Sequence, residues 1–305
     1  MRIVIAGGTG LLGRALTTWL TSEGHEVIVL TRHANSDVGA RVRAVAWTPD
    51  GSAGPWAREI DGADGVINLA GAGIAEGRWT PSRKTRLRSS RIDSTRSLVT
   101  AVAQASTPPP VFVQGSAVGY YGSTLDAGAI DESSPAGSDF LARLAVEWES
   151  AANAVAAARP CRLVIVRTGV ALSREGGALP RLAQPFRFFV GGPIGTGRQF
   201  VPWITIGDWV AMVVWAIQTP AISGPINATA PEPVTNAQFA SALARVLRRP
   251  NLFPVPSFVL RILLGEMADA IVLGGQRVVP ALAQAHGFAF AQADLERALA
   301  AILRP

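Results

Sequence analysis

The chain has 305 residues, of which 49% are hydrophobic and 16% charged, and its formal net charge is +6. This composition predicts a well-buried globular protein and excludes a disordered one. The single cysteine, Cys161, excludes internal disulfides and a metal site built from several cysteines. Its place before an apolar run predicts a small buried core residue.

The positive charge does not by itself indicate a nucleic-acid partner. The basic residues are almost all arginine and spread along the chain, and Lys84 is the only lysine. Their one dense cluster, residues 83–91, is predicted to be a helix with a solvated face or a contact to an anionic small molecule, because no nucleic-acid motif accompanies it. The longest apolar run, residues 209–217, is too short to span a bilayer, and no signal peptide precedes the first strand. We expect a cytoplasmic protein with no nucleic-acid or membrane partner.

The first predicted strand, residues 3–6, leads into a turn in which glycine recurs at every third position, and an amphipathic helical stretch follows. In such a turn one glycine allows the bend, one lets the backbone approach a pyrophosphate, and one lets the helix pack closely on the sheet. The order strand, turn, helix therefore predicts dinucleotide binding, with a plain turn as the alternative. The expected cofactor contacts are Gly7, Thr9, Gly10, Leu11, Leu12 and Gly13.

Strand and helix signals alternate through the first half of the chain. Two long helices are predicted at about 81–105 and 139–158, and apolar runs predict further strands at 27–30, 42–46, 66–69, 111–114 and 163–166. This alternation predicts right-handed crossovers and an α/β fold, a doubly wound parallel sheet of the Rossmann type. We expect this dinucleotide-binding domain to occupy residues 1–170.

Glycine and proline punctuate residues 176–197, which predicts loops over a crevice, and a mostly helical stretch begins at Thr235. We therefore expect residues 171–305 to form a smaller, mostly helical C-terminal domain. Within it, residues 203–228 should return to the main sheet through a helix at 208–219 and a strand at 225–228.

The end of the second strand indicates the nicotinamide cofactor. An acidic residue there would bind the ribose 2′-hydroxyl of NAD, but the strand ends in Thr31 and Arg32, and the next carboxylate is Asp37. Thr31 can donate to a 2′-phosphate and Arg32 can pair with its charge, which favours NADP(H) over NAD(H). In the alternative, Arg32 merely begins a solvated loop. Small residues after the fourth strand are expected to pack against the cofactor, namely Leu69, Ala70 and Gly71.

Three motifs together resemble the short-chain dehydrogenase/reductase superfamily in its extended, epimerase-like form: Gly7–Gly13, Asn68–Gly71 and Ser116–Gly122. The sequence is most similar to an atypical branch, the epimerase-family or SulA-like proteins, in segments 77–80, 90–91, 167–170, 191–197, 203–204 with Asp208, 227–231 with 234–236, and 274–278. The resemblance implies a cofactor-binding sheet with a small C-terminal domain. It also implies NADP(H) binding through the glycine turn, Thr31, Arg32, Leu69, Ala70 and Arg91.

The usual catalytic pair of that superfamily, Tyr-x-x-x-Lys on one helical turn, is missing. The chain has one lysine and two tyrosines, Tyr120 and Tyr121, and none of them lies in the expected helix. That helix has Asp139 in the tyrosine position and Arg143 in the lysine position. Arg143 is expected to bind ribose hydroxyls or phosphate, although a guanidinium is a poor proton shuttle. Asp139, or Ser138 before it, is better interpreted as the helix cap.

Ser116, at the end of the fifth strand, is expected to point into the nicotinamide crevice and to hydrogen-bond a substrate carbonyl or hydroxyl. Tyr120 or Tyr121 would then donate a proton, with a pKa lowered by Arg143 or Arg167. In the alternative, weighted equally, both tyrosines are pocket walls with satisfied hydroxyls. The catalytic candidates are therefore Ser116, Tyr121 and Tyr120.

Other chemistries receive less support. The histidines are scattered, at His25, His33 and His286, so we expect no metal site and no Ser-His-Asp triad. Asp131–Glu132 resembles the acidic loop of the extended enzymes or is a solvated turn. The glycine-rich region supplies three candidate substrate contacts, Gln199, Trp203 and Asp208.

Two functions remain open at this point. One is an NADP(H)-dependent oxidoreductase or nucleotide-sugar-epimerase-like protein, acting on a small hydroxyl- or carbonyl-bearing substrate with atypical acid–base residues. The other is a non-catalytic NADP(H)-binding protein whose cofactor controls a partner-binding surface. A monomer or a homodimer is expected, the dimer through the helices at 81–105 and 139–158 by analogy with related enzymes.

Overall fold

The computed structural model describes residues 1–32, 41–123, 128–157 and 161–304, so His33 and Asp37 lie outside the described residues. One sheet has seven parallel strands in the order β10-β6-β5-β4-β1-β2-β3. In chain order they are β1 (Arg2–Ala6), β2 (Glu26–Thr31), β3 (Val42–Ala46), β4 (Gly65–Asn68), β5 (Val111–Ala117), β6 (Arg162–Thr168) and β10 (Gly224–Ala228). The predicted Rossmann-like fold is confirmed.

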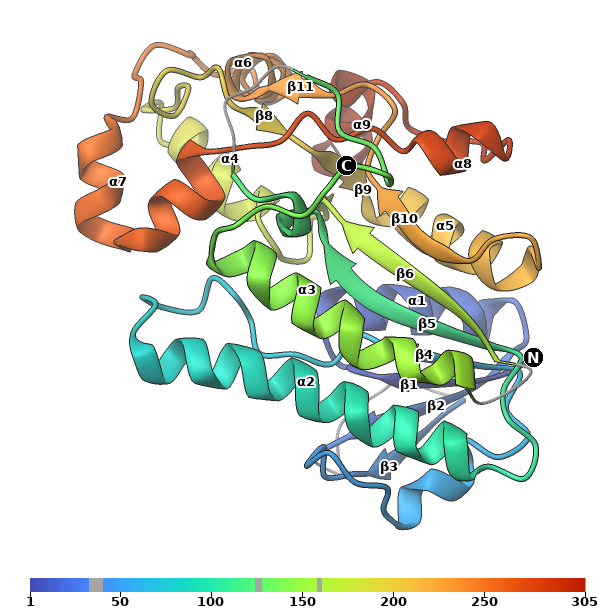
Figure 1. Ribbon diagram of the computed structural model, residues 1–305. Coiled ribbons are helices and arrows are strands. Elements are labelled where there is room, and N and C mark those ends of the chain that lie inside the picture. The colour runs from blue at the N-terminus through green and yellow to red at the C-terminus, as the bar shows by residue number, and fades with distance from the viewer. Residues whose placement is uncertain (33–40, 124–127, 158–160, 305) are drawn as a thin grey trace.

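Helices cover both faces of this sheet (Figure 1). α1 (Leu11–Ser22) and α5 (Ile206–Gln218) pack on the face that holds Ile3 and Ile5. α2 (Pro81–Gln104) packs on the opposite face with Val4, and α3 (Phe140–Ala152) lies beside it. Because successive side chains of a strand point to opposite faces, a strand covered on both sides reads as an uninterrupted apolar run. This explains why the strands were visible in the sequence.

The two long helices begin where their capping residues predict. The Thr80 hydroxyl accepts from the Arg83 amide at 3.2 Å, and Asp139 Oδ1 accepts from the Ala142 amide at 2.9 Å, which confirms Asp139 as a helix cap. α3 ends earlier than expected, at Ala152, and continues as a 3₁₀ turn, η3 (Asn153–Ala157). Residue 158, the expected end, lies outside the described residues.

The elements of the second half gather at the carboxyl ends of β5 and β6 (Figure 1). They are α4 (Leu179–Arg187), α6 (Asn236–Leu247), α7 (Ser257–Leu264), the π-helical turn η4 (Ala268–Leu273), α8 (Ala281–Ala285) and α9 (Leu295–Leu303). Two small strand pairs join them, β7 (Val170–Leu172) with β9 (Trp203–Thr205) and β8 (Phe200–Val201) with β11 (Val234–Thr235). Short 3₁₀ turns are η1 (Pro55–Glu59) and η2 (Val118–Tyr121).

The expectation of loops throughout residues 176–197 is wrong for α4. Pro180 stands in the first turn of this helix, where a missing N–H costs nothing, and Pro185 lies inside it. Two prolines in nine residues concealed the helix from the sequence pattern. Among the described helices, none is long and apolar enough to cross a bilayer.

Candidate functional site

The glycine turn after β1 is shaped by close approaches of the backbone. Gly7 has a φ of 84°, and a Cβ on it would lie 2.6 Å from the carbonyl carbon of Leu69. A Cβ on Gly13 would lie 2.3 Å from the Gly7 carbonyl oxygen, so α1 packs this closely on the turn only with glycine at that position. A Cβ on Gly10 would meet only that same oxygen, at 3.3 Å. Packing therefore requires glycine at positions 7 and 13. Gly10 leaves the backbone at the start of α1 uncovered by a side chain.

The start of α1 offers backbone amides to an anion. Gly10 is the N-cap, no side chain caps this end, and the Arg14 amide donates to the Gly10 carbonyl at 2.8 Å. Across the described ranges, the amides of Leu11, Leu12 and Gly13 have no acceptor. Because the first N–H groups of a helix also carry the positive end of its dipole, this end is suited to a phosphate group.

A cavity of about 500 Å³, here named the sheet-edge cavity, opens at the carboxyl ends of β1, β2 and β4. Eight expected cofactor contacts line it: Gly7, Thr9, Gly10, Thr31, Arg32, Leu69, Ala70 and Gly71. The other wall was not predicted from the sequence and includes Trp47, Pro49, Arg86, Ser89, Ser90 and Asp93. The basic cluster at 83–91 was the available signal, since three of these residues belong to it.

The wall formed by residues 69–71 is held in place by Asn68 at the end of β4. Its Nδ2 donates to Thr95 Oγ1 at 2.9 Å and to Gln114 Oε1 at 3.0 Å, while its Oδ1 accepts from the Ala70 amide at 3.1 Å. All the hydrogen-bonding atoms of this buried amide are thereby used on protein groups. Asn68 shapes the cavity and leaves the ligand contacts to the backbone that follows it.

Arg91, an expected cofactor contact, lies behind this wall and does not line the cavity. Its side chain is buried, and its Nη1 donates to the carbonyls of Ala72 and Leu87, both at 3.0 Å. A Cβ on Gly71 would lie 3.1 Å from the guanidinium carbon. Burial lowers the pKa of Arg91 to about 10. Arg91 therefore stabilises the wall formed by residues 69–71 on the side away from the cavity.

Polar side chains at the ends of β5 and β6 form a buried cluster, which we call the Glu149–Arg167 network. Arg167 Nε and Nη2 donate to the two carboxylate oxygens of Glu149 at 3.0 and 2.9 Å, and Ser116 Oγ donates to the same carboxylate at 2.6 Å. Arg167 Nη1 donates to the Tyr121 hydroxyl at 3.0 Å, and this hydroxyl donates to Asn227 Oδ1 at 2.7 Å. All five residues are buried.

The network does not match the roles expected of the catalytic candidates. Ser116 is engaged by Glu149 and, contrary to expectation, lines neither the sheet-edge cavity nor the second cavity described below. The expected lowering of the Tyr121 pKa is wrong: burial raises the pKa of Tyr121 to about 12, which outweighs the opposing effect of Arg167. Tyr120 is half-buried, with its ring centre 3.5 Å from the Arg167 guanidinium carbon. The Tyr121 hydroxyl is satisfied, as in the alternative, but neither tyrosine lines the sheet-edge cavity or the second cavity as a pocket wall.

Two acidic candidates connect distant segments of the chain. Asp208 is 2% exposed, and its carboxylate accepts from the amides of residues 291–292 at 2.7 and 3.1 Å. The carboxylate of Glu132 accepts from the amides of Asn227 and Leu282 at 2.9 and 3.2 Å. Neither the expected substrate contact at Asp208 nor a solvated turn at Glu132 describes these residues, because both carboxylates bind backbone of the protein.

Arg143 and Trp203 also lie away from the expected positions. Arg143 is exposed on α3, where its Nη1 donates to the carbonyl of Ser138, and it lines neither the sheet-edge cavity nor the second cavity. Trp203 is fully buried in the core formed by the C-terminal elements. Cys161 is a buried free thiol, as expected, and burial raises its pKa to about 12. In the described ranges, no group of His, Cys, Asp and Glu is arranged to hold a metal ion.

A second cavity, of about 260 Å³, separates the sheet from the C-terminal elements. Its sheet wall includes residues 118–119 and 168–170, and its C-terminal wall includes residues 199–202, 270–272 and 274–276 with Ile194 and Asn236. Of the three expected substrate contacts, only Gln199 lines it. Among the described residues of its lining, none carries a titratable side chain.

Two protein-family models match this chain, one over the residues of the sheet and one over the C-terminal elements. Residues 3–228 match the model of the NAD dependent epimerase/dehydratase family. The chain belongs to this family. Residues 255–302 of this epimerase-family chain match a second model, described as a domain of unknown function (DUF1731). Both matches confirm the resemblance found in the sequence.

The epimerase-family relatives extend over the whole chain. It is 41% identical to the epimerase family protein YfhF of Bacillus subtilis over 303 residues, covering 99% of this chain and 98% of the relative. The crystal structure of human epimerase family protein SDR39U1 (isoform 2) with NADPH matches with a TM-score of 0.88 at 34% identity, over 99% of both chains. A nucleoside-diphosphate sugar epimerase from Corynebacterium glutamicum matches with a TM-score of 0.80 at 34% identity, over 99% of this chain and 58% of that one.

In this epimerase-family member the only lysine serves the packing of the C-terminal elements. Lys84 Nζ lies 2.6 Å from Glu266 Oε2 and 4.8 Å from the centre of the Phe140 ring. It therefore links α2 to the segment after α7, and it makes no hydrogen bond to the Glu149–Arg167 network. Lys84 therefore does not take the role of the lysine in the missing Tyr-x-x-x-Lys pair.

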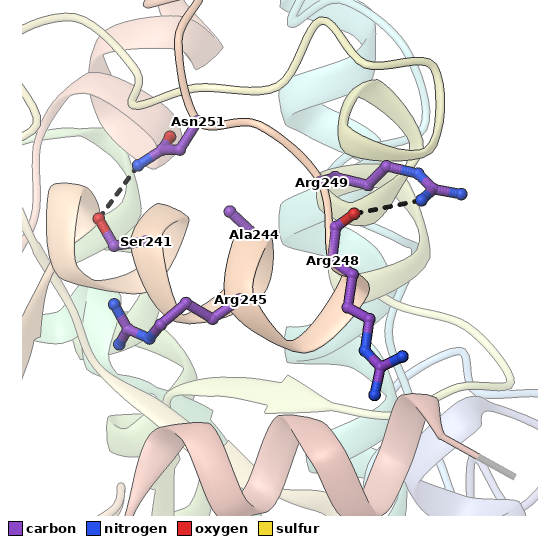
Figure 2. Close-up of a pocket in the computed structure, with 6 residues that line it drawn as sticks. All are labelled: Ser241, Ala244, Arg245, Arg248, Arg249 and Asn251. Carbon is purple, nitrogen blue, oxygen red and sulfur yellow. Dashed lines mark hydrogen bonds between the residues drawn. The ribbon is translucent and has the colours of Figure 1, made fainter.

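A third cavity of the epimerase-family chain lies at the end of α6 and contains none of the expected site residues. Figure 2 shows its arginines, Arg245, Arg248 and Arg249, pointing away from one another. Arg245 pairs with Glu296 at 2.8 Å, and Arg249 lies 4.4 Å from the Phe189 ring centre. Because the guanidinium groups diverge, they do not form a common anion site.

Proposed function

We propose that this epimerase-family chain is an NADP(H)-dependent oxidoreductase that interconverts a carbonyl and the corresponding alcohol of a small substrate. The observation that carries the proposal is the sheet-edge cavity, in which Thr31 ends β2 and Arg32 follows it, beside the uncapped start of α1. The NADPH in the human SDR39U1 crystal structure, the 0.88 TM-score neighbour, supports the same cofactor.

The lining of the sheet-edge cavity suits a cofactor with an additional phosphate. Arg32 and Arg86 both line it, so two guanidinium groups are available to a 2′-phosphate dianion. The carboxylates in the lining, Glu76 and Asp93, come from elsewhere than the end of β2, where a carboxylate would bind the 2′-hydroxyl of NAD. The amides of residues 11–13 are placed for the pyrophosphate.

The second cavity is the proposed place of the reaction. When bound, NADPH supplies a hydride to the carbonyl carbon while the substrate oxygen takes up a proton from solvent, which gives the alcohol and NADP⁺. The chain contributes a sheet wall for the nicotinamide end and a C-terminal wall for the substrate. Proton transfer from solvent is part of the proposal because Ser116 and Tyr121 bind other side chains of the protein.

Cofactor binding without turnover is a second candidate function. It is favoured by one observation, the absence of a titratable side chain among the described residues that line the second cavity. In this case NADP(H) would stabilise a surface of the protein that binds a partner, and the cofactor would leave unchanged.

Fluorescence titration with NADPH and NADH tests the proposed cofactor. We expect NADPH to bind at least tenfold more tightly than NADH, since a charge-assisted phosphate contact contributes about 1.5–3 kcal/mol. Equal affinities would show the assignment of Thr31 and Arg32 to be wrong. Consumption of NADPH with carbonyl compounds then separates the two functions: oxidation of bound NADPH supports the oxidoreductase, and unchanged NADPH with every compound supports binding alone.

A further inference from the structure

We propose that the second cavity binds an uncharged, largely apolar alcohol or carbonyl compound and excludes nucleotide diphosphate sugars. This inference rests on the proposed function, because it names the substrate class of the proposed reaction site. It separates this chain from the Corynebacterium neighbour, which is a nucleoside-diphosphate sugar epimerase.

The walls of the second cavity are almost entirely apolar. Besides glycine and proline backbone, the side chains that line it include Val118, Leu141, Val170, Leu182, Ile194, Phe200, Val201 and Ile271. No arginine, lysine or histidine is among the described lining residues. A diphosphate moved from water into such a cavity would lose its hydration and gain no cation, which is strongly unfavourable.

The neighbouring arginines do not supply that cation. Arg167 is buried, and its guanidinium is already paired with the Glu149 carboxylate. Arg198 and Arg277 adjoin lining residues in the sequence, but both are exposed and outside the lining. The charge balance of the cavity therefore favours a neutral occupant.

Three buried carboxamides provide the polar contacts of the C-terminal wall. Gln199, Asn236 and Gln276 are 3%, 7% and 7% exposed, and each uses one end of its amide on protein backbone. Gln199 Nε2 donates to the carbonyls of Ile194 and Val272 at 3.0 and 3.1 Å. Asn236 Oδ1 accepts from the Ile194 amide at 2.7 Å, and Gln276 Nε2 donates to a backbone carbonyl.

The opposite ends of these carboxamides make no hydrogen bond to the described part of the protein. They comprise two acceptors, Gln199 Oε1 and Gln276 Oε1, and one donor group, Asn236 Nδ2. These ends are not among the buried atoms that lack a partner, so they are accessible from the cavity they line. A ligand that pairs with them gains specificity, because an analogue without the matching group would leave them unpaired in the complex. A hydroxyl can donate to the acceptors, and a carbonyl can accept from Asn236. None of the three can neutralise a charge.

Calorimetric titration of the NADP⁺-saturated protein with matched neutral and anionic probes tests the inference. The probes are cinnamyl alcohol and acetophenone, with cinnamate and benzoate as their anionic counterparts and UDP-glucose as the nucleotide sugar. We expect each neutral probe to bind at least tenfold more tightly than its anionic counterpart, and UDP-glucose not to bind. Tighter binding of an anion or of UDP-glucose overturns the inference, and so does a failure of both neutral probes to bind.

An Asn236→Asp variant places a charge in the cavity at little structural cost. Aspartate retains the Oδ1 acceptor for the Ile194 amide, and position 236 opens α6, where the helix dipole favours an anion. We expect the affinity for the neutral probes to fall at least tenfold while NADPH still binds. The matched control is Gln238→Glu in the same first turn of α6, which keeps the acceptor for the Thr235 amide, lies outside the lining and should leave probe affinity unchanged. Unchanged affinity in Asn236→Asp would place the probes elsewhere and overturn the inference.

NADPH titration of the unaltered protein distinguishes the two levels of the proposal. If NADPH does not bind, the proposed function fails whatever the probes do. If NADPH binds and the anionic probes or UDP-glucose bind best, only the substrate class is wrong.

Discussion

Polar groups at two places along the same sheet edge have opposite environments: some line an open cavity, and others are buried and bind one another. At the ends of β1, β2 and β4, side chains such as Thr31 and Arg32 line an open cavity beside unpaired helix amides. At the ends of β5 and β6, Ser116, Tyr121 and Arg167 bind one another and Glu149 in the interior. Position at the carboxyl edge of a parallel sheet therefore does not make a residue available for chemistry. Burial and the partners of each group decide that.

The largest expected effect is a loss of stability when the buried Glu149–Arg167 network is disrupted. A Glu149→Gln substitution leaves the Arg167 guanidinium in the interior without its carboxylate, so we expect the free energy of unfolding to fall by about 3–5 kcal/mol. Urea denaturation measures it. The control on the same helix is Glu147→Gln, whose partner Arg88 is exposed, with an expected loss below about 1 kcal/mol. Equal losses in the two variants would contradict a stabilising role of the network.

The glycine turn allows packing and ligand binding to be separated. Gly13→Ala forces a Cβ against the Gly7 carbonyl, so we expect a loss of about 1–3 kcal/mol in stability. Gly10→Ala brings its Cβ to 3.3 Å from the same oxygen, a tight contact that a small shift relieves, so the loss should be smaller, about 1 kcal/mol or less. Because that methyl group would stand at the uncapped start of α1, NADPH affinity should fall at least tenfold. Thermal unfolding and NADPH fluorescence measure both variants, and full NADPH affinity in a folded Gly10→Ala protein would argue against a phosphate at this position.

An Arg32→Ala variant tests whether the side chains of the sheet-edge cavity bind the cofactor. Loss of a charge-assisted contact to the 2′-phosphate should weaken NADPH binding about tenfold and leave NADH binding unchanged. Arg297→Ala removes an exposed arginine of α9 that does not line the sheet-edge cavity, and it should alter neither affinity. If Arg32→Ala lost the same affinity for NADPH and NADH, Arg32 would contact a group that both cofactors have and not the 2′-phosphate.

The expected effect with the narrowest range, confined to pH above 10, is a dependence of stability on alkaline pH. The pKa of Tyr121 is raised from 10.0 to about 12 in the folded protein, so its contribution to stability is fully present below pH 10 and is lost as the pH rises through 12. Ultraviolet absorbance should show a phenolate that forms late in wild type and Tyr120→Phe but not in Tyr121→Phe. A Tyr121 phenolate that forms near pH 10 would contradict its burial.

Features that depend on a few consecutive residues could be predicted from the sequence. The β1 strand and glycine turn, the Thr31–Arg32 end of β2 and the Asp139 cap each depend on a few consecutive residues. The partners of Ser116 and Asp208 could not be predicted this way, because they lie 33 and more than 80 residues away. One signal was available and unused: Glu149 follows Ala142 and Ala145 at helical spacing, and a carboxylate on a buried helix face requires a cation.

The Asp208 carboxylate has a consequence for how the protein is made. Ala291, whose amide it accepts, follows Asp208 by 83 residues, so Asp208 leaves the ribosome well before its partner. During that interval the buried carboxylate has the Thr205 hydroxyl as a partner but lacks both backbone amides, which makes packing of α5 on the sheet less favourable. We therefore expect a chain that ends before residue 291 to hold α5 less stably than the full chain does.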